Sequence, residues 1–175
     1  ALSYDKQLEY KKKKVLNNLT RIGGLTELPE FDLIGMDEPY CYRNKAQFPF
    51  GTDKNGEIVT GFYAGRTHSI ISNTKCYLGV EENEQILEII LAHLKKYNIP
   101  AYDEQTGKGL LRHVLIRKGF TTGELMVCLI LNGTRMPEVK EMVAELVKIL
   151  GMTSITINVN TKQTNVIMGQ EMRSV

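Results

Sequence analysis

The stretch Tyr42-Arg43-Asn44-Lys45-Ala46-Gln47-Phe48 decides the fold, because its residues alternate in the manner of a β-strand. Successive residues of a strand point to opposite faces, so one face carries Tyr42, Asn44, Ala46 and Phe48. The other face carries Arg43, Lys45 and Gln47. The first face suits a hydrophobic core, and the second suits contact with phosphate groups.

The segments around this stretch predict an α+β fold with a mainly antiparallel sheet. The expected strands cover residues 43–50, 58–64, 110–118, 124–131, 155–159 and 165–169. The expected helices cover residues 4–21, 81–97 and 137–150. Asn55-Gly56, between the first two strands, is a strong hairpin signal. A helix followed by two strands, three times over, is typical of an α+β domain.

Two segments carry specific expectations about burial. Residues 125–131 have no polar side, which predicts a central strand covered on both faces, with Cys128 as a small core residue. His93 lies on the apolar stripe of the helix at 81–97, which favours a hydrogen-bonded core histidine over a metal ligand.

Composition predicts a soluble globular protein, because 42% of the residues are hydrophobic and 24% are charged. A length of 175 residues fits one domain of ordinary size or two small ones. With a net charge of +2, the basic residues matter only where they cluster. No run approaches the roughly 18 apolar residues of a membrane span, so we expect a cytoplasmic protein without membrane partners. Three cysteines scattered along the chain predict reduced thiols and no disulfide framework. Neither a glycine-rich nucleotide loop nor a Cys-x-x-Cys metal motif is visible.

The polar residues of the two central hairpins predict either RNA contact or an ordinary solvated sheet face. The candidate RNA-binding residues are Arg43, Lys45, Gln47, Arg66, His68, Arg112 and Arg117. Basic side chains on a sheet surface can contact phosphates, and Gln47 can hydrogen-bond to a base edge or a ribose hydroxyl. In the alternative interpretation, nearby acids such as Asp53 and Glu57 balance these charges.

Five segments in register resemble the RumA/TrmA family of RNA uracil-5-methyltransferases, in its central RNA-contacting domain. These segments are Leu2–Leu8 with the lysine-rich helix that follows, Tyr42–Phe48, Gly61–Tyr63, Leu111–Arg117 with Thr122–Val127, and Asn158–Gly169. Members of that family transfer a methyl group from S-adenosylmethionine to carbon 5 of a uridine in ribosomal or transfer RNA. The resemblance covers nearly the whole chain.

The resemblance implies that residues 1–175 are the central, substrate-contacting domain of such an enzyme. Residues 1–24 would form the helix that follows a cysteine-containing segment in the family. The catalytic Rossmann-type domain and the N-terminal β-barrel of the family are not found in this sequence. We therefore assign no catalytic residue, and expect the isolated chain to be inactive and not to bind S-adenosylmethionine.

The resemblance also implies a 4Fe-4S cluster in the parent protein, with Cys76 as one of its four cysteine ligands. A single thiolate cannot hold such a cluster stably, so we expect the cluster to be absent from this fragment. Cys76 as a fortuitous loop cysteine is the alternative. A cluster-type Cys76 favours ribosomal RNA over transfer RNA as the substrate. The alternative for the whole chain is a stand-alone α+β interaction or ligand-binding module unrelated to methylation.

Overall fold

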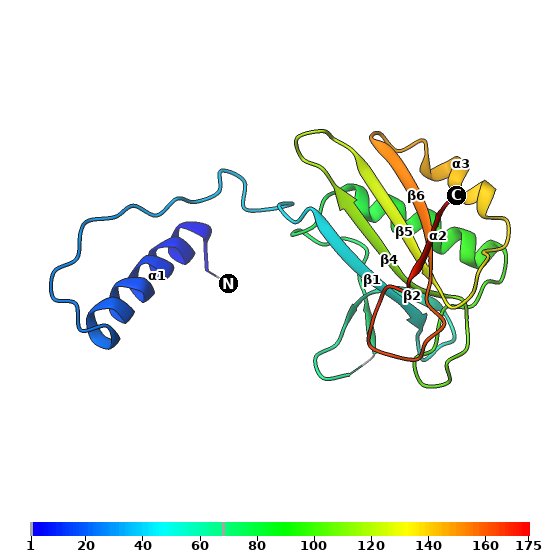
Figure 1. Ribbon diagram of the computed structural model, residues 1–175, viewed down its shortest axis with the longest axis horizontal. Coiled ribbons are helices and arrows are strands. Elements are labelled where there is room, and N and C mark those ends of the chain that lie inside the picture. The colour runs from blue at the N-terminus through cyan, green and yellow to red at the C-terminus, as the bar shows by residue number, and fades with distance from the viewer. Residues whose placement is uncertain (1, 68) are drawn as a thin grey trace. The chain divides into compact units, whose positions relative to one another are not determined.

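The computed structural model describes residues 2–67 and 69–175, and it divides the chain into two compact units (Figure 1). The first unit ends at Pro39, and the second comprises Tyr40–Val175. In the described part of the chain, no helix combines the length and the apolar character needed to cross a membrane.

The first unit is built on the helix expected near the N-terminus. It consists of α1 (Tyr4–Asn17), a π-helical turn η1 (Asn18–Ile22) and an extended return segment. The return segment is tied to the helix where the Met36 N–H donates to the Tyr4 hydroxyl at 2.7 Å. Neither α1 nor η1 contains a buried residue. The unit therefore has no core of its own.

The second unit is a seven-stranded sheet, counted over the described residues, with the order β3-β2-β1-β4-β5-β6-β7. Its strands are β1 (Lys45–Thr52), β2 (Ile58–Tyr63), β3 (Ile70–Ser72), β4 (Leu111–Lys118), β5 (Leu125–Leu131), β6 (Met152–Val159) and β7 (Glu171–Ser174). All neighbours pair antiparallel except β5 and β6. The expected α+β class with a mainly antiparallel sheet is confirmed.

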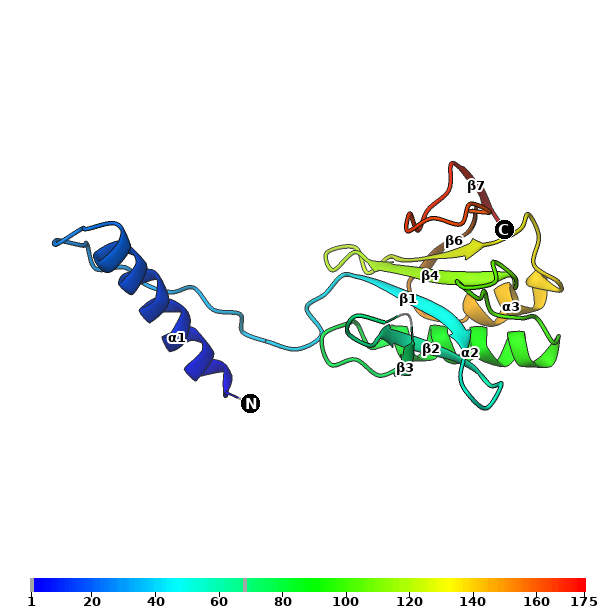
Figure 2. The same cartoon turned by 90° about the horizontal axis from the view of Figure 1, so that it is seen from below.

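Two helices cover one face of this sheet, namely α2 (Glu82–Lys96) and α3 (Val139–Leu146). Figure 2 shows both helices beneath the strands, while β7 and the loop before it rise above the opposite face. We call the face without helices the outer face. Because α3 connects β5 to β6 as a crossover, these two strands run parallel.

The helix-covered face holds the main hydrophobic core. Phe48 of β1, Val114 of β4 and Leu129 of β5 are each 0% exposed within it. A smaller apolar cluster, centred on Cys128 and Ile130, lies on the outer side of β5. The expectation that β5 is a central strand covered on both faces is therefore confirmed.

His93 also confirms its sequence interpretation as a core histidine. It is 6% exposed on α2, and its Nε2 lies 2.9 Å from the Pro137 carbonyl oxygen. The imidazole is therefore satisfied by the backbone at the start of the α3 segment.

Several elements differ from the sequence expectation. The strand expected at 165–169 is wrong: those residues form a loop, and β7 begins at Glu171. The amide group of Asn160 donates to the Val166 and Ile167 carbonyls at 2.7 and 2.9 Å, which occupies the loop backbone that a strand would pair. The helix expected at 137–150 is regular only within α3, and the short strand β3 was not expected.

The start of β1 also differs. β1 begins at Lys45, so the expectation that Arg43 and Lys45 share one strand is wrong. The Arg43 N–H donates instead to the Leu78 carbonyl at 2.9 Å, in an isolated parallel bridge with Gly79. The next residue, Asn44, still accepts the Lys118 N–H of β4 at 2.9 Å, so regular pairing with β4 begins only after this bridge.

Candidate nucleic-acid interface

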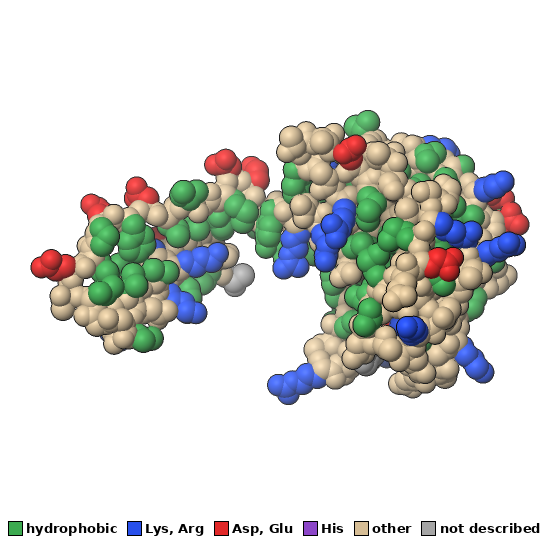
Figure 3. All heavy atoms as spheres, viewed as in Figure 1, with side chains coloured by type: hydrophobic (Ala, Val, Ile, Leu, Met, Phe, Trp, Pro, Cys, Tyr) green, Lys and Arg blue, Asp and Glu red, His purple; other side chains and the backbone are tan. Residues whose placement is uncertain are grey.

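The outer face carries a pair of like charges on neighbouring strands. Ala46 and Phe48 pack into the core on the helix side, so the alternating residues Lys45 and Gln47 point outward. In the β1–β4 register, Lys45 lies directly opposite Arg117, and both residues are exposed. Figure 3 shows Lys and Arg side chains near hydrophobic side chains on this side of the sheet.

No carboxylate among the described residues lies within ion-pair distance of Lys45 or Arg117. The two acids that could balance them are engaged elsewhere. Oδ1 of Asp53 accepts the backbone N–H groups of Asn55 and Glu57 at 2.8 and 2.9 Å, which lowers the pKa of Asp53. The Glu57 carboxylate lies 3.3 Å from the Lys95 ammonium. Like charges facing each other across two strands are destabilising, so an anion bound between them would relieve that repulsion.

Two further basic residues flank these strands in the sequence. Arg43 lies two residues before β1 and is exposed. Arg66 is exposed in the turn after β2. We call Arg43, Lys45, Arg66 and Arg117 the basic group. The remaining candidate of this turn, His68, lies outside the described residues.

Arg112 is not a surface arginine, in contrast to its sequence interpretation. It lies beside a register shift between Leu111 and His113, and is 2% exposed because Tyr102 and the loop after β6 cover it. Its Nη1 donates to the carbonyls of Asn160 and Lys162 at 2.9 and 2.7 Å. The guanidinium also lies 4.3 Å from the centre of the Tyr102 ring. Arg112 therefore anchors the loop after β6, while its Nε has no hydrogen-bond partner among the described residues.

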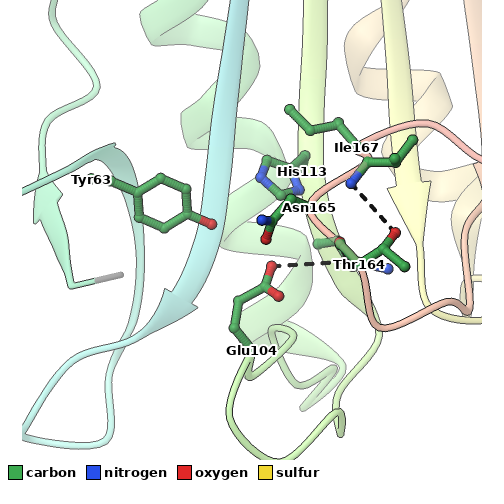
Figure 4. A pocket seen from close by; sticks show the side chains of 8 residues that line it. Tyr63, Glu104, His113, Thr164, Asn165 and Ile167 are labelled. Carbon is green, nitrogen blue, oxygen red and sulfur yellow. Dashed lines mark hydrogen bonds and ion pairs between the residues drawn. The ribbon is translucent and has the colours of Figure 1, made fainter. Parts of the chain in front are cut away.

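A cavity of about 200 Å³ opens on the outer face beside Arg112. Its lining residues are Tyr63, Glu104, Arg112, His113, Thr164, Asn165, Val166 and Ile167. Figure 4 shows the Tyr63 ring reaching in from β2 toward Asn165 and His113, with the Glu104 carboxylate rising from below. Two strands and two loops thus bring these side chains together.

Burial and nearby charges shift the pKa values of two residues that line this cavity, His113 and Tyr63. His113 is 6% exposed, and burial together with the nearby Arg112 charge lowers its pKa from 6.5 to about 4. In the part of the chain that the structure describes, its Nδ1 has no hydrogen-bond partner. Burial and the Glu104 charge raise the pKa of Tyr63, against an opposing effect of Arg112. At neutral pH the imidazole and the phenol are therefore both uncharged.

The cavity adjoins a larger groove of about 890 Å³. Cavity and groove share four lining residues, namely Tyr63, Glu104, Thr164 and Asn165. The turn of the first hairpin and the turn before β3 contribute to the opposite wall of the groove. A chain lying in the groove would therefore pass the mouth of the cavity.

The sequence interpretation did not single out Tyr63, Glu104, His113 or Asn165. Alternation along β4 places His113 on the same face as Arg117, so that signal was available. Glu104 and Asn165 come from loops whose meeting point no local pattern indicates.

Cys76 is a free, half-buried thiol. The Cys41 N–H donates to the Tyr77 carbonyl at 2.8 Å, so the backbones of two cysteine-containing segments lie side by side. Within residues 2–67 and 69–175, no three His, Cys, Asp or Glu side chains gather as metal ligands. A 4Fe-4S cluster normally takes four thiolates, so the residues of this chain alone do not fit one.

Comparison with known proteins shows which proteins this chain is similar to. It is 43% identical over 172 residues to an uncharacterized RNA methyltransferase of Clostridium acetobutylicum, covering 97% of this chain and 37% of that protein. It is also 43% identical over 175 residues to an uncharacterized RNA methyltransferase of Listeria monocytogenes, covering 99% of this chain and 38% of that protein. The chain spans somewhat more than a third of the length of the curated relatives it matches. No protein-family model matches it.

A solved structure shares the fold. The crystal structure of Pyrococcus abyssi tRNA (uracil-54, C5)-methyltransferase in complex with S-adenosyl-L-homocysteine matches with a TM-score of 0.73. The match covers 98% of this chain and 38% of that one, at 22% sequence identity. The described architecture therefore recurs as part of a longer protein. The relatives at about 40% identity are named RNA methyltransferases.

Proposed function

We propose that this chain is the central, substrate-contacting domain of an S-adenosylmethionine-dependent RNA uridine C5-methyltransferase. The observation that carries the proposal is the unbalanced pair Lys45 and Arg117, which face each other on an outer sheet surface free of helices. The similarity to proteins named RNA methyltransferases supplies the class of ligand. The stand-alone interaction or ligand-binding module is the alternative.

In this proposal the basic group binds the RNA backbone. Guanidinium and ammonium groups neutralise phosphates and fix the register of the RNA without reading its sequence. Gln47, beside Lys45 on the outer face, offers an amide to a base edge or a ribose hydroxyl. We assign no catalytic residue to this chain, so in this proposal transfer of the methyl group belongs to the parent enzyme. The isolated chain is expected to be inactive.

Two finer assignments are part of the proposal. The first is that Cys76 ligates a 4Fe-4S cluster in the parent protein, with the other thiolates supplied from outside this chain. The second is that ribosomal RNA is the substrate in preference to transfer RNA. Iron content of the natural gene product, and methylation assays on both RNA classes, test these assignments separately.

The proposal predicts salt-dependent RNA binding by the chain as given. Binding of a fluorescent single-stranded RNA is measured by anisotropy over a range of salt concentrations, because each neutralised phosphate steepens the salt dependence. Lys45→Gln and Arg117→Gln should each weaken binding and lower the slope of log K against log salt by about one.

Lys140→Gln is the matched control, because Lys140 is an exposed lysine on α3, on the helix-covered side. It should leave affinity and slope unchanged. If all three variants behave alike, the outer face is only solvated. Absence of any RNA binding would favour the stand-alone module.

A further inference from the structure

Two residues that line the cavity each have a buried polar atom without a partner among the described residues. Nε of Arg112 and Nδ1 of His113 make no hydrogen bond within residues 2–67 and 69–175, although the two residues are 2% and 6% exposed. Leaving such buried groups without hydrogen bonds destabilises the folded protein. Both residues line the same cavity, which opens to the outer face. A ligand that supplies hydrogen bonds there would remove this cost.

The charges of the cavity argue against a phosphate as that ligand. His113 is neutral at physiological pH, because burial and Arg112 hold its pKa at about 4. The Arg112 guanidinium already donates to backbone carbonyls through Nη1, at 2.7 and 2.9 Å. The Glu104 carboxylate at the wall would repel a second anion. The site is thus suited to an uncharged ligand with hydrogen-bonding groups.

The shape and the donor and acceptor groups fit a flat heterocycle. The Tyr63 ring forms one wall, and its centroid lies 6.4 Å from that of the His113 ring. Aromatic side chains commonly stack on unpaired bases of single-stranded RNA. The Asn165 amide offers both a donor and an acceptor. A cavity of about 200 Å³ has room for one base.

Glu104 narrows the choice of base. Its Oε1 lies 3.9 Å from Nη2 of Arg112, which holds the charge in place but is too long for a hydrogen bond. The carboxylate oxygens therefore remain available as acceptors. Among the four RNA bases, guanine has an edge with two adjacent N–H donors, at N1 and N2, that one carboxylate can accept together.

We propose that this cavity binds a single unstacked guanine of the RNA substrate, with Tyr63 against the base and Glu104 accepting from its N1 and N2 edge. The inference rests on the proposed function for its RNA ligand, but it adds a sequence-reading site separate from the basic group. Such a site would select which RNA segment the basic group holds.

The test uses short single-stranded RNAs that differ only in one central base, G, A, C or U, flanked by uridines. At fixed salt the guanine RNA should bind on the order of tenfold more tightly than the others, as expected for a bidentate base contact. Glu104→Gln should abolish that preference while leaving binding of the uridine RNA unchanged. Asn165→Ala, at an exposed position, should reduce the preference without affecting folding.

Gln105→Ala is the matched control, because Gln105 lines the adjoining groove but not the cavity. It should retain the guanine preference, whereas Lys45→Gln should weaken all four RNAs equally. Guanosine monophosphate alone should bind more weakly than the guanine RNA. Equal binding of the two would contradict the proposal that the cavity takes its guanine from RNA.

The outcomes separate this inference from the proposed function. If the chain binds all four RNAs equally and Glu104→Gln changes nothing, the guanine site is wrong while the basic group stands. A preference for another base also overturns it. If no RNA binds, both proposals fail.

Discussion

The two faces of one sheet differ in how completely their side chains are satisfied. Under α2 and α3, Phe48, Val114 and Leu129 are fully buried in a continuous apolar core. On the outer face, Lys45 and Arg117 oppose each other without a carboxylate partner in the described chain, and His113 has an unpartnered ring nitrogen. The same strands β1, β4 and β5 build both faces.

This difference separates stability from function along each strand. Residues that point toward the helices contribute buried apolar area, which is the main favourable term in folding. Residues that point outward leave repulsion and unmet hydrogen bonds, which cost stability unless a ligand compensates for them. Like charges opposed on neighbouring strands are therefore a better guide to a binding surface than net charge, which is only +2 for the whole chain.

The largest expected effect comes from the helix-covered face. Leu129→Ala should destabilise the protein by about 2–5 kcal/mol, because it leaves a cavity at a fully buried position. Cys128→Ala, one residue earlier and on the outer side of β5, should cost less than about 1.5 kcal/mol, since less volume is removed. Urea unfolding of both variants tests the contrast, and equal losses would contradict it.

Acid should weaken the fold through His113 on the outer face. The pKa of His113 is about 4 in the folded protein and 6.5 ordinarily. Between these pH values the unfolded chain binds a proton at this histidine and the folded protein does not. The contribution of neutral His113 to the free energy of unfolding is fully present above pH 6.5 and is lost as the pH falls toward 4. At pH 5 the loss amounts to about 2 kcal/mol. His113→Gln should flatten this decline in urea unfolding between pH 7 and pH 5. An unchanged pH dependence would assign the acid loss to other groups.

The smallest effect sharpens the comparison between stability and binding. Lys45→Gln removes the repulsion with Arg117 and should stabilise the protein by on the order of a few tenths of a kcal/mol at low salt. Lys45→Arg keeps the charge and should leave stability unchanged. Thermal unfolding at low and high salt measures both variants. A loss of stability in Lys45→Gln would show that Lys45 has a favourable partner.

The sequence predicted the elements that repeat a local pattern and missed those set by distant contacts. Alternation found β1 and β5, the Asn55-Gly56 turn found the hairpin, and helical spacing found α2 with its buried His93. The position of β7 was missed because Asn158 and Asn160 hold the preceding loop through side-chain hydrogen bonds.

The candidate site was predictable only in part. Lys45 and Arg117 could be placed on sheet surfaces from alternation, but their direct opposition depends on the β1–β4 register. Arg112 was misplaced because the loop after β6, distant in the sequence, covers its side chain and accepts its hydrogen bonds. Glu104 and Asn165 meet at the cavity from loops about sixty residues apart, which no short-range rule connects.

The central claim is that the outer face, and not the helix-covered side, contacts RNA. Lysine acylation followed by mass spectrometry tests it directly, because a bound phosphate backbone shields the ammonium groups beneath it. We predict that single-stranded RNA protects Lys45 from acylation while Lys140 on α3 reacts as in the free protein. Protection of Lys140 with an unprotected Lys45 would contradict the account.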